Sequence, residues 1–408
     1  MSKIEVKDLY LIFGSRRKHA LELVKKGMSK DEVLSKTKCT VAVKDATFSI
    51  EQGEIFVVMG LSGSGKSSLI RCFNRLNTPT SGSIFVNGED VTRMTEEQLR
   101  RLRRTEMSMV FQHFGLLPHR TVLSNTAFGL EIQGKPEEES LEKARQMIKT
   151  VGLEGYEDMM TGELSGGMQQ RVGLARALTT NPEILLMDEA FSALDPLIRT
   201  NMQDELIELQ RKLKKTIVFI THDLDEALKL GDRIAIMKDG EIVQIGTPEE
   251  ILVKPADDYV RAFVENVDRS KIVTASSLMF KDTGKLIIEK DGPALALRRM
   301  REMGVNRLPV VDRENKFLGF VMDRDVVELK NKDDRDLKKI LISDVMPKVS
   351  PDTPAADLLP LFIDKQLPLP VVDEEDRLLG VAVHSSVIAE VTGRDREEII
   401  EIKNSGGL

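Results

Sequence analysis

The stretch IFVVMGLSGSGKS, residues 55–67, decides the fold. Its first five residues, 55–59, form a continuous apolar run, as in a strand that is buried on both faces of a parallel sheet. The next eight fit the pattern GxxxxGK[ST], and a helical stretch begins near Ser67. Strand, glycine-rich loop and helix in this order predict a loop that binds phosphate.

The residues of this loop suit a nucleotide. Glycines let the backbone curl until its N–H groups point at phosphate oxygens, and the following helix N-terminus adds positive potential. Lys66 would reach the β and γ phosphates, and the Ser67 hydroxyl would bind Mg²⁺. The predicted ATP contacts here are Gly60, Leu61, Ser62, Gly63, Ser64, Gly65, Lys66, Ser67 and Ser68.

Further apolar runs alternate with helical stretches on both sides of the loop. Residues 3–14 read as a strand, and buried runs follow at 108–111, 184–187, 217–220 and 234–237. Runs of Val, Ile, Leu and Met that are separated by helices indicate a parallel sheet with both faces covered. We therefore expect an α/β fold.

Two carboxylates follow one of these runs. Asp188 and Glu189 come directly after residues 184–187, so they lie at the sheet edge where doubly wound folds bind ligands. Asp188 can hold Mg²⁺ through water, and Glu189 can polarise the water that attacks the γ-phosphate. Together with the phosphate loop, the pair predicts nucleotide hydrolysis.

Several motifs stand in the order of an ATP-binding-cassette ATPase. After the phosphate loop come Leu164–Arg171 (LSGGMQQR), the acid pair, Ser192–Asp195 and Thr221–Asp223. The chain resembles the nucleotide-binding subunit of a transporter over roughly residues 3–267. The resemblance implies a P-loop cassette with a helical subdomain, using ATP and Mg²⁺.

The resemblance assigns further roles, residue by residue. Gln112 would touch Mg²⁺ and report to the membrane subunit, and His222 would contact the γ-phosphate. Two cassettes would close head to tail, so that each ATP lies between one chain's phosphate loop and the signature segment of a second copy. The additional nucleotide-binding residues are then Ser165, Gly166, Gly167, Met168 and Asp195, with Met168 where the commonest form has Gln. Phe13, which ends the first strand, is the candidate for stacking on adenine, or else a core side chain.

Residues 111–122 (FQHFGLLPHRTV) narrow the resemblance to ATPase subunits of glycine betaine and proline importers. Phe114 in this stretch is either an anchor for the membrane subunit or part of the helical packing. A basic insert at 15–38, with eight basic and three acidic residues, also fits that branch. The periodicity predicts a helix with a basic face, which is either solvated or a docking face for a membrane or partner.

The C-terminal third contains a repeat. LPVVD at 308–312 recurs at 369–373, and Gly319 recurs as Gly380, both at an offset of 61 residues (369 − 308 and 380 − 319). This resembles a tandem pair of α+β CBS domains. The usual ligand pattern has Ser or Thr three residues after the glycine and Asp three later, of which only Asp325 is present. In osmoprotectant importers such pairs are implicated in control by ionic strength and by cyclic di-AMP.

These features predict three parts. They are an ATPase domain at 1–266, with the helical subdomain at about 113–178, a first CBS domain at 267–332, and a second CBS domain with a tail at 333–408.

Composition limits the function classes. The net charge is −7, which argues against general binding to nucleic acid. Two cysteines, no signal peptide and no run of about 18–20 apolar residues indicate a reducing compartment and a separate chain for the membrane spans. We expect a peripheral subunit on the cytoplasmic face of the membrane, with a permease, a second copy and an anionic lipid surface as partners.

Three other functions stay open. They are an importer of another small molecule such as methionine or another amino acid, a soluble cassette ATPase of translation or DNA repair, and a nucleotide-sensing regulator. Intact Glu189 and His222 argue against the last.

Overall fold

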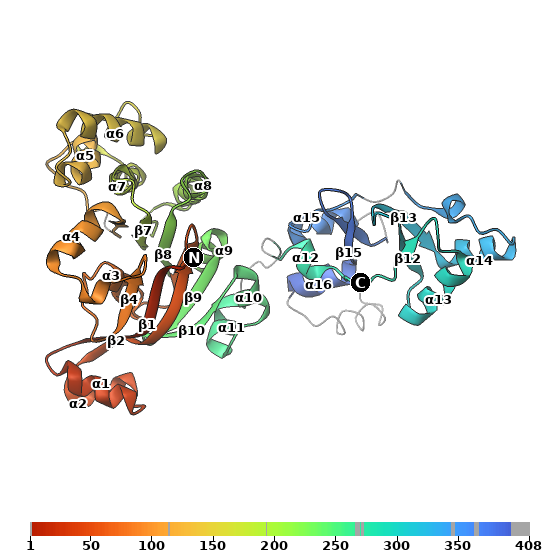
Figure 1. Ribbon diagram of the computed structural model, residues 1–408, viewed down its shortest axis with the longest axis horizontal. Helices are drawn as coiled ribbons and strands as arrows, with labels where there is room; N and C mark the ends of the chain where they lie inside the picture. Colours follow the sequence, from red (N-terminus) through yellow and green to blue (C-terminus); the bar gives the residue numbers. More distant parts are fainter. Residues whose placement is uncertain are drawn as a thin grey trace. The chain divides into compact units, whose positions relative to one another are not determined.

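The computed structural model describes residues 2–112, 115–192, 194–265, 270, 273–343, 347–362 and 367–392. The chain divides into two compact units, Met1–Val267 and Asp268–Leu408 (Figure 1). Each unit is described by itself below. Within the described residues, no helix combines the length and the apolar character needed to cross a membrane.

A six-stranded sheet forms the centre of the first unit, in the order β10-β9-β3-β8-β7-β6. Its strands are parallel except for β10, which runs antiparallel to β9. The predicted apolar runs are therefore strands of one parallel sheet. The strands are β3 Ile55–Met59, β6 Met107–Val110, β7 Ile184–Asp188, β8 Thr216–Thr221, β9 Arg233–Lys238 and β10 Glu241–Gly246.

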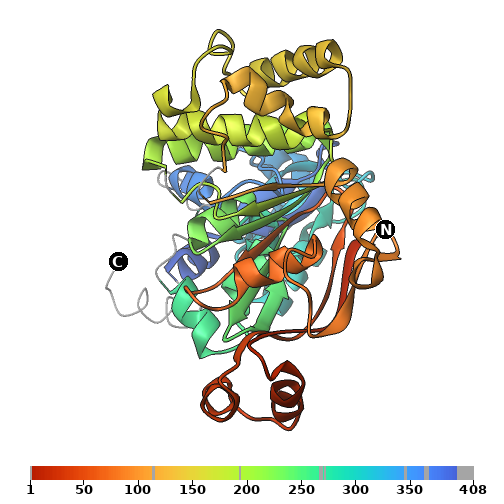
Figure 2. The same ribbon diagram turned by 90° about the vertical axis from the view of Figure 1, so that its left-hand side faces the viewer.

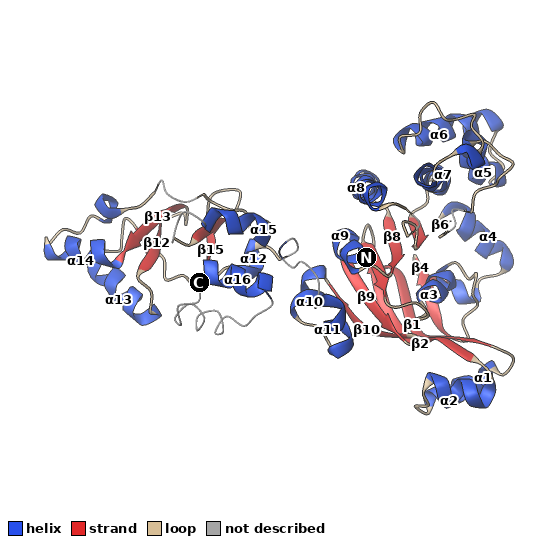
Figure 3. Ribbon diagram, turned by 180° about the vertical axis from the view of Figure 1, so that it is seen from behind, coloured by secondary structure: helices blue, strands red, loops and turns tan. Residues whose placement is uncertain are grey.

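A second, antiparallel sheet lies against the first (Figure 3). Its order is β2-β1-β4-β5, with β1 Ser2–Phe13, β2 Thr40–Glu51, β4 Ser81–Val86 and β5 Glu89–Asp90. Phe48 of β2 stacks on Phe56 of β3, with ring centroids 5.3 Å apart. Helix α3, Lys66–Phe73, buries Leu69 and Phe73 in the same core. The helix that follows the phosphate loop is thus fixed by apolar packing.

Helices α5, α6 and α7 pack on one another in a separate layer above the parallel sheet (Figure 2). They span Val122–Ile132, Glu137–Thr150 and Gly166–Thr179. The remaining helices of the first unit are α4 Glu96–Thr105, α8 Pro196–Leu213, α9 Leu224–Leu230, α10 Pro248–Val253 and α11 Asp258–Val264.

The basic insert forms two helices, α1 Arg17–Lys25 and α2 Lys30–Thr37. The helix predicted from the periodicity is α1, which buries Ala20, Leu23 and Val24, and the second helix was not predicted. Gly27, with a φ of 87°, turns the chain between them. Ser29 then starts α2 in a capping box with Glu32, which explains the break. Apolar side chains of both helices pack on β1 and β2, so the insert is fastened to the cassette.

The second unit contains two strand hairpins with helices alongside (Figure 3). The first hairpin joins β12 Arg307–Val311 to β13 Phe317–Met322, and the second joins β14 Leu369–Val372 to β15 Leu378–Ala382. Strand β11 Leu286–Ile287 extends the first sheet. The helices are α12 Ala275–Leu278, α13 Pro293–Met303, α14 Asp323–Asn331, α15 Ala355–Leu358 and α16 His384–Thr392.

The repeat extends to the strand register. In the first hairpin the paired residues are Leu308 and Val321, Pro309 and Phe320, Val310 and Gly319, and Val311 and Phe317. In the second they are Leu369 and Ala382, Pro370 and Val381, Val371 and Gly380, and Val372 and Leu378. Each residue is shifted by 61, the irregularity before the last pair included (369 − 308 and 378 − 317). The duplication seen in the sequence is therefore a duplication of structure.

The recurring glycines have a common physical role. A Cβ atom on Gly319 would collide with the carbonyl oxygen of Ile342, and one on Gly380 would lie 2.6 Å from the carbonyl oxygen of Phe280. Ile342 pairs with Phe320, and Phe280 pairs with Val381. In each hairpin, the glycine-containing strand thus pairs with a segment that precedes the other repeat in the sequence. The glycines are required where that backbone passes.

We predict that Gly319→Ala lowers the free energy of unfolding by about 1–3 kcal/mol, because it adds a backbone collision at a strained φ of 155°. Calorimetric unfolding of the full chain would measure it. The control is Gly292→Ala, because a Cβ there meets nothing within 4 Å. Equal stability of the two variants would contradict the prediction.

Candidate functional site

The phosphate loop connects the carboxyl end of β3 to the first turn of α3. A Cβ atom on Gly65 would collide with the carbonyl oxygen of Ala42, so only glycine permits this close approach. Gly65 also begins α3 without a side-chain cap, which leaves the first N–H groups of the helix for a ligand. The buried Ser64 hydroxyl has no partner among the described residues. This cradle fits the phosphates of a nucleotide.

Lys66 lies in the loop that it would serve. Its Nζ donates to the carbonyl oxygens of Gly60 and Leu61, at 2.8 and 3.1 Å, and lies 4.0 Å from Glu189 Oε1. Burial lowers the pKa of the ammonium group, while the carboxylates of Glu189 and Asp188 oppose that shift. The ammonium group of Lys66 thus lies inside the loop, where a bound phosphate would be.

Asp188 joins the phosphate loop to β7. Its carboxylate is almost fully buried, with 1% of the residue exposed. Oδ1 accepts a hydrogen bond from the Ser67 hydroxyl at 2.7 Å, and Oδ2 accepts one from Arg71 at 3.0 Å. A hydroxyl and a carboxylate beside a phosphate site are the protein ligands that Mg²⁺ uses with a nucleotide. The predicted metal residues Ser67 and Asp188 therefore fit the ion.

Glu189 is surrounded by the other predicted catalytic residues. Gln112 Nε2 donates to Glu189 Oε2 at 3.1 Å, and His222 Nδ1 lies 3.7 Å from the same oxygen. Gln112 follows β6, Glu189 follows β7 and His222 follows β8, so three neighbouring parallel strands bring them to one edge. Lys66, in the loop that follows β3, lies near Glu189 as well, so the structure brings all four predicted residues together.

Phe13 ends β1 and pairs with Thr40 of β2. Its side chain is exposed, unlike a core residue. Two residues along β2, the Ala42 carbonyl abuts Gly65 of the phosphate loop. The position is compatible with a ring stacked on a base beside the phosphates.

The signature segment lies away from the phosphate loop within one chain. Ser165 caps α7 and accepts from the Met168 N–H at 3.4 Å, while Ser165 and Gly166 are exposed. Asp195 is exposed at the start of α8, and its side chain makes no capping bond. In the described part of the chain, no hydrogen bond or ion pair joins these residues to Gly60–Ser67. Phe114 lies outside the described residues.

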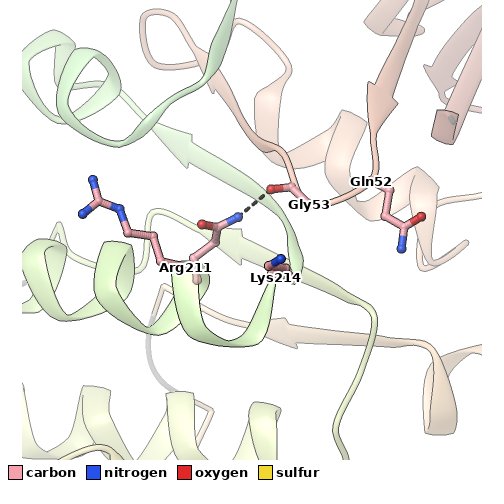
Figure 4. Close-up of a pocket in the computed structure, with 5 residues that line it drawn as sticks. Gln52, Gly53, Arg211 and Lys214 are labelled. Atoms are coloured by element: carbon pink, nitrogen blue, oxygen red, sulfur yellow. Dashed lines mark hydrogen bonds between the residues drawn. The ribbon is translucent and has the colours of Figure 1, made fainter. Parts of the chain in front are cut away.

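A hollow of about 630 Å³ lies at the other end of the parallel strands (Figure 4). It is lined by Gln52, Gly53, Gln210, Arg211 and Lys214. Gly53 precedes β3 and Lys214 precedes β8, so the hollow is at the amino edge of the sheet. It is separate from the residues around Glu189.

Sequence reasoning missed two neighbours of the site. Arg71 pairs with Asp188, and its spacing of four residues from Ser67 on α3 places both on one helix face. Lys30, on insert helix α2, has its Nζ 3.5 Å from the Gly63 carbonyl oxygen. That contact spans 33 residues, and no local pattern signals it.

Both units of the chain are similar to known protein families. The ABC transporter family matches residues 43–192, and the CBS domain matches residues 294–332 and 338–393. The chain is 50% identical over 395 residues to the glycine betaine/carnitine transport ATP-binding protein GbuA of Listeria monocytogenes, which covers 97% of this chain and 99% of that protein. It is 49% identical to the glycine betaine/proline betaine protein ProV of Salmonella typhimurium, over 93% of this chain and 95% of that one.

A solved structure is similar to the first unit. The dimeric structure of MJ0796, a bacterial ABC transporter cassette, superposes with a TM-score of 0.52 at 30% identity, covering 60% of this chain and 98% of that chain. The same cassette is also known in a post-hydrolysis state bound to ADP and Pi.

We predict that Glu189→Gln lowers the ATP turnover number by about a hundredfold or more, because the amide cannot accept a proton from water. ATP binding should persist, since Lys66 and the loop are intact. Phosphate release and binding of a fluorescent ATP analogue would measure the two effects. Glu208→Gln is the control, because Glu208 is exposed and pairs only with Lys212 among the described residues. Loss of binding together with turnover would contradict a role in hydrolysis alone.

Proposed function

This chain belongs to the ABC transporter family as an ATP-binding subunit, and we propose that the transporter it serves imports glycine betaine, or else proline betaine or proline. Its enzymatic activity is ATP hydrolysis coupled to transport. The observation that carries the proposal is the near full-length similarity to betaine transport subunits, combined with an intact cluster around Glu189.

The chain's own residues perform the hydrolysis. Lys66 and the loop N–H groups hold the β and γ phosphates, and Phe13 stacks on the adenine. Glu189 polarises the attacking water while Gln112 and His222 hold it and the γ-phosphate in line. Ser67, Asp188 and Gln112 would hold Mg²⁺, which would supply positive charge beside the phosphates.

A second copy of the chain completes each site. Ser165, Gly166 and Asp195 are exposed and do not reach their own chain's phosphate loop. In a head-to-tail pair they, with Gly167 and Met168, would close over the partner's ATP. Binding would then close the pair and hydrolysis would reopen it.

The other partners are a membrane permease and the lipid surface around it, at the cytoplasmic face. The basic insert supports the lipid contact, because seven of its eight Lys and Arg residues are exposed and the eighth, Lys30, reaches the phosphate loop. Attraction to anionic headgroups weakens as salt rises, since the Debye length is about 10 Å at 0.1 M. Rising cytoplasmic salt would release the insert and activate hydrolysis.

We predict that the subunit, assembled with its permease in anionic liposomes, hydrolyses ATP in response to glycine betaine with its binding component, and more strongly as salt rises. Replacing three exposed insert residues, R16Q/K18Q/K26Q, should shift activation to lower salt, because less attraction remains to be screened. ATP turnover against salt would measure both effects.

The matched control is R313Q/K330Q/R335Q, which removes the same charge from exposed positions in the second unit. An equal shift in the control would refute a special role for the insert. Turnover that ignores lipid charge at every salt concentration would refute lipid control. Turnover driven by another solute would reassign the cargo while leaving the ATPase intact.

Cyclic di-AMP at the CBS pair is a second regulatory proposal. A hollow of about 310 Å³ in the second unit is lined by Lys281, Lys285 and Arg299, together with Asp282 and with Leu378 of the second repeat. Arg299 is also paired with Asp291 at 3.1 Å. Two phosphates and flat bases could be held by such a set of cations and apolar side chains.

We predict that calorimetric titration of the full chain with cyclic di-AMP, in excess ADP to occupy the ATP site, gives saturable heat. Lys281→Gln should weaken the binding, because it removes one of the cations that line the hollow. Lys330→Gln, an exposed lysine away from the hollow, is the control. A titration without heat would count against direct binding.

A further inference from the structure

Glu189 and His222 can lie close together only if the two loops that carry them keep a fixed position relative to each other. One loop runs from Glu189 after β7 to the start of α8, and the other contains His222 after β8. Glu189 N–H donates to the Ile220 carbonyl at 3.1 Å, which aligns the strand ends. Beyond that point His222 is largely exposed, and among the described residues the contacts that join its loop to the other involve side chains.

Arg199 lies between these loops. It is one turn into α8, where its N–H donates to the Asp195 carbonyl at 2.8 Å. Its Nη2 donates to the Leu194 carbonyl at 3.1 Å, in the loop after β7. Its Nη1 lies 3.6 Å from Asp223 Oδ2, in the loop after β8. One guanidinium group thus contacts both loops.

The far end of this contact is fixed. Asp223 N–H donates to the Thr221 hydroxyl at 3.0 Å, and Asp223 Oδ1 accepts from the Glu226 N–H at 3.2 Å. The buried Glu226 side chain accepts in turn from Gln203 of α8 at 3.0 Å. Asp223 is therefore held at both ends of its loop, so its pairing with Arg199 constrains the neighbouring His222.

Burial of part of the Arg199 side chain costs stability, which indicates that its contacts with the two loops serve a function. Its Nε is buried and has no partner among the described residues. A buried donor without a partner destabilises the folded chain. The two other guanidinium nitrogens are nevertheless directed at the two loops that carry the catalytic residues.

We propose that Arg199 is a positioning residue that clamps the loop after Glu189 to the loop containing His222, and so keeps His222 within reach of the attacked phosphate. The clamp acts through Leu194 and Asp223, without touching ATP. The inference depends on ATP hydrolysis by this chain and not on the cargo of the transporter.

The test measures the turnover number and KM for ATP in Arg199→Ala, Arg199→Lys and Asp223→Asn, all in the full-length chain. Arg199→Ala should lower turnover about tenfold with KM changed less than about twofold, because displaced catalytic groups slow the reaction while the phosphate loop still binds ATP. Arg199→Lys should recover part of the loss. Asp223→Asn should lower turnover to a similar extent, because it weakens the clamp from the other side.

A double-mutant cycle separates positioning from simple destabilisation. If Arg199 acts through His222, Arg199→Ala should slow His222→Ala by less than about twofold. Additive losses, or a rise in KM that accounts for the whole effect, would overturn the proposal. If Arg199→Ala unfolds below the assay temperature, Arg199→Lys and Asp223→Asn decide alone, and wild-type turnover in both would overturn it.

Arg211→Ala is the matched control, because Arg211 lies on the same helix but lines the hollow at the opposite edge of the sheet. Its turnover should equal that of the wild type, and a tenfold loss there would show that any change on α8 has the same effect. A wild-type chain that hydrolyses no ATP would contradict the family function itself, which is a different result from a failure of the clamp.

Discussion

The rest of the cassette depends on the bonds that the buried carboxylate of Asp188 makes with helix α3. Placing a charge where only 1% of the residue is exposed is costly unless it is hydrogen-bonded and paired. Ser67 donates a hydrogen bond to this carboxylate, Arg71 donates a hydrogen bond and supplies the opposite charge, and both residues lie on α3. The same two bonds that stabilise the Asp188 carboxylate therefore bring β7 to the phosphate loop. Glu189 is the next residue, so its distance from Lys66 follows from this pairing.

Parallel strands add the remaining geometry. Because β6, β7 and β8 are neighbours, the residues that follow them reach one edge without any long connection. The amino edge carries a different surface, the hollow with Arg211 and Lys214. Catalytic chemistry and the basic hollow are thus at opposite ends of the same sheet.

Much of this could be predicted from local patterns. The apolar runs predicted the strands, and the glycine-rich loop, acid pair and His222 predicted a cluster that the structure contains. The helix predicted in the insert is α1, whereas α2, which begins at the capping box of Ser29, was not predicted. Arg71, Lys30 and Arg199 were missed because each also pairs with a group on another segment: Arg71 with Asp188, 117 residues away, Lys30 with Gly63, and Arg199 with Asp223. Such pairs depend on the finished fold and leave no periodic signal.

The crossing segments of the second unit constrain the order in which it can form. Val273, Ala275 and Leu278 lie in the core with Leu369 and Val371, and Phe280 pairs with Val381. During synthesis the earlier segment must therefore wait until about a hundred more residues have left the ribosome (381 − 280 = 101). Until then its apolar side chains have no partner from the second hairpin. A chain that ends before β15 would leave the apolar side chains of the earlier segment without these partners. The number of residues between the two hairpins therefore sets how long that segment is exposed to aggregation and proteolysis during synthesis.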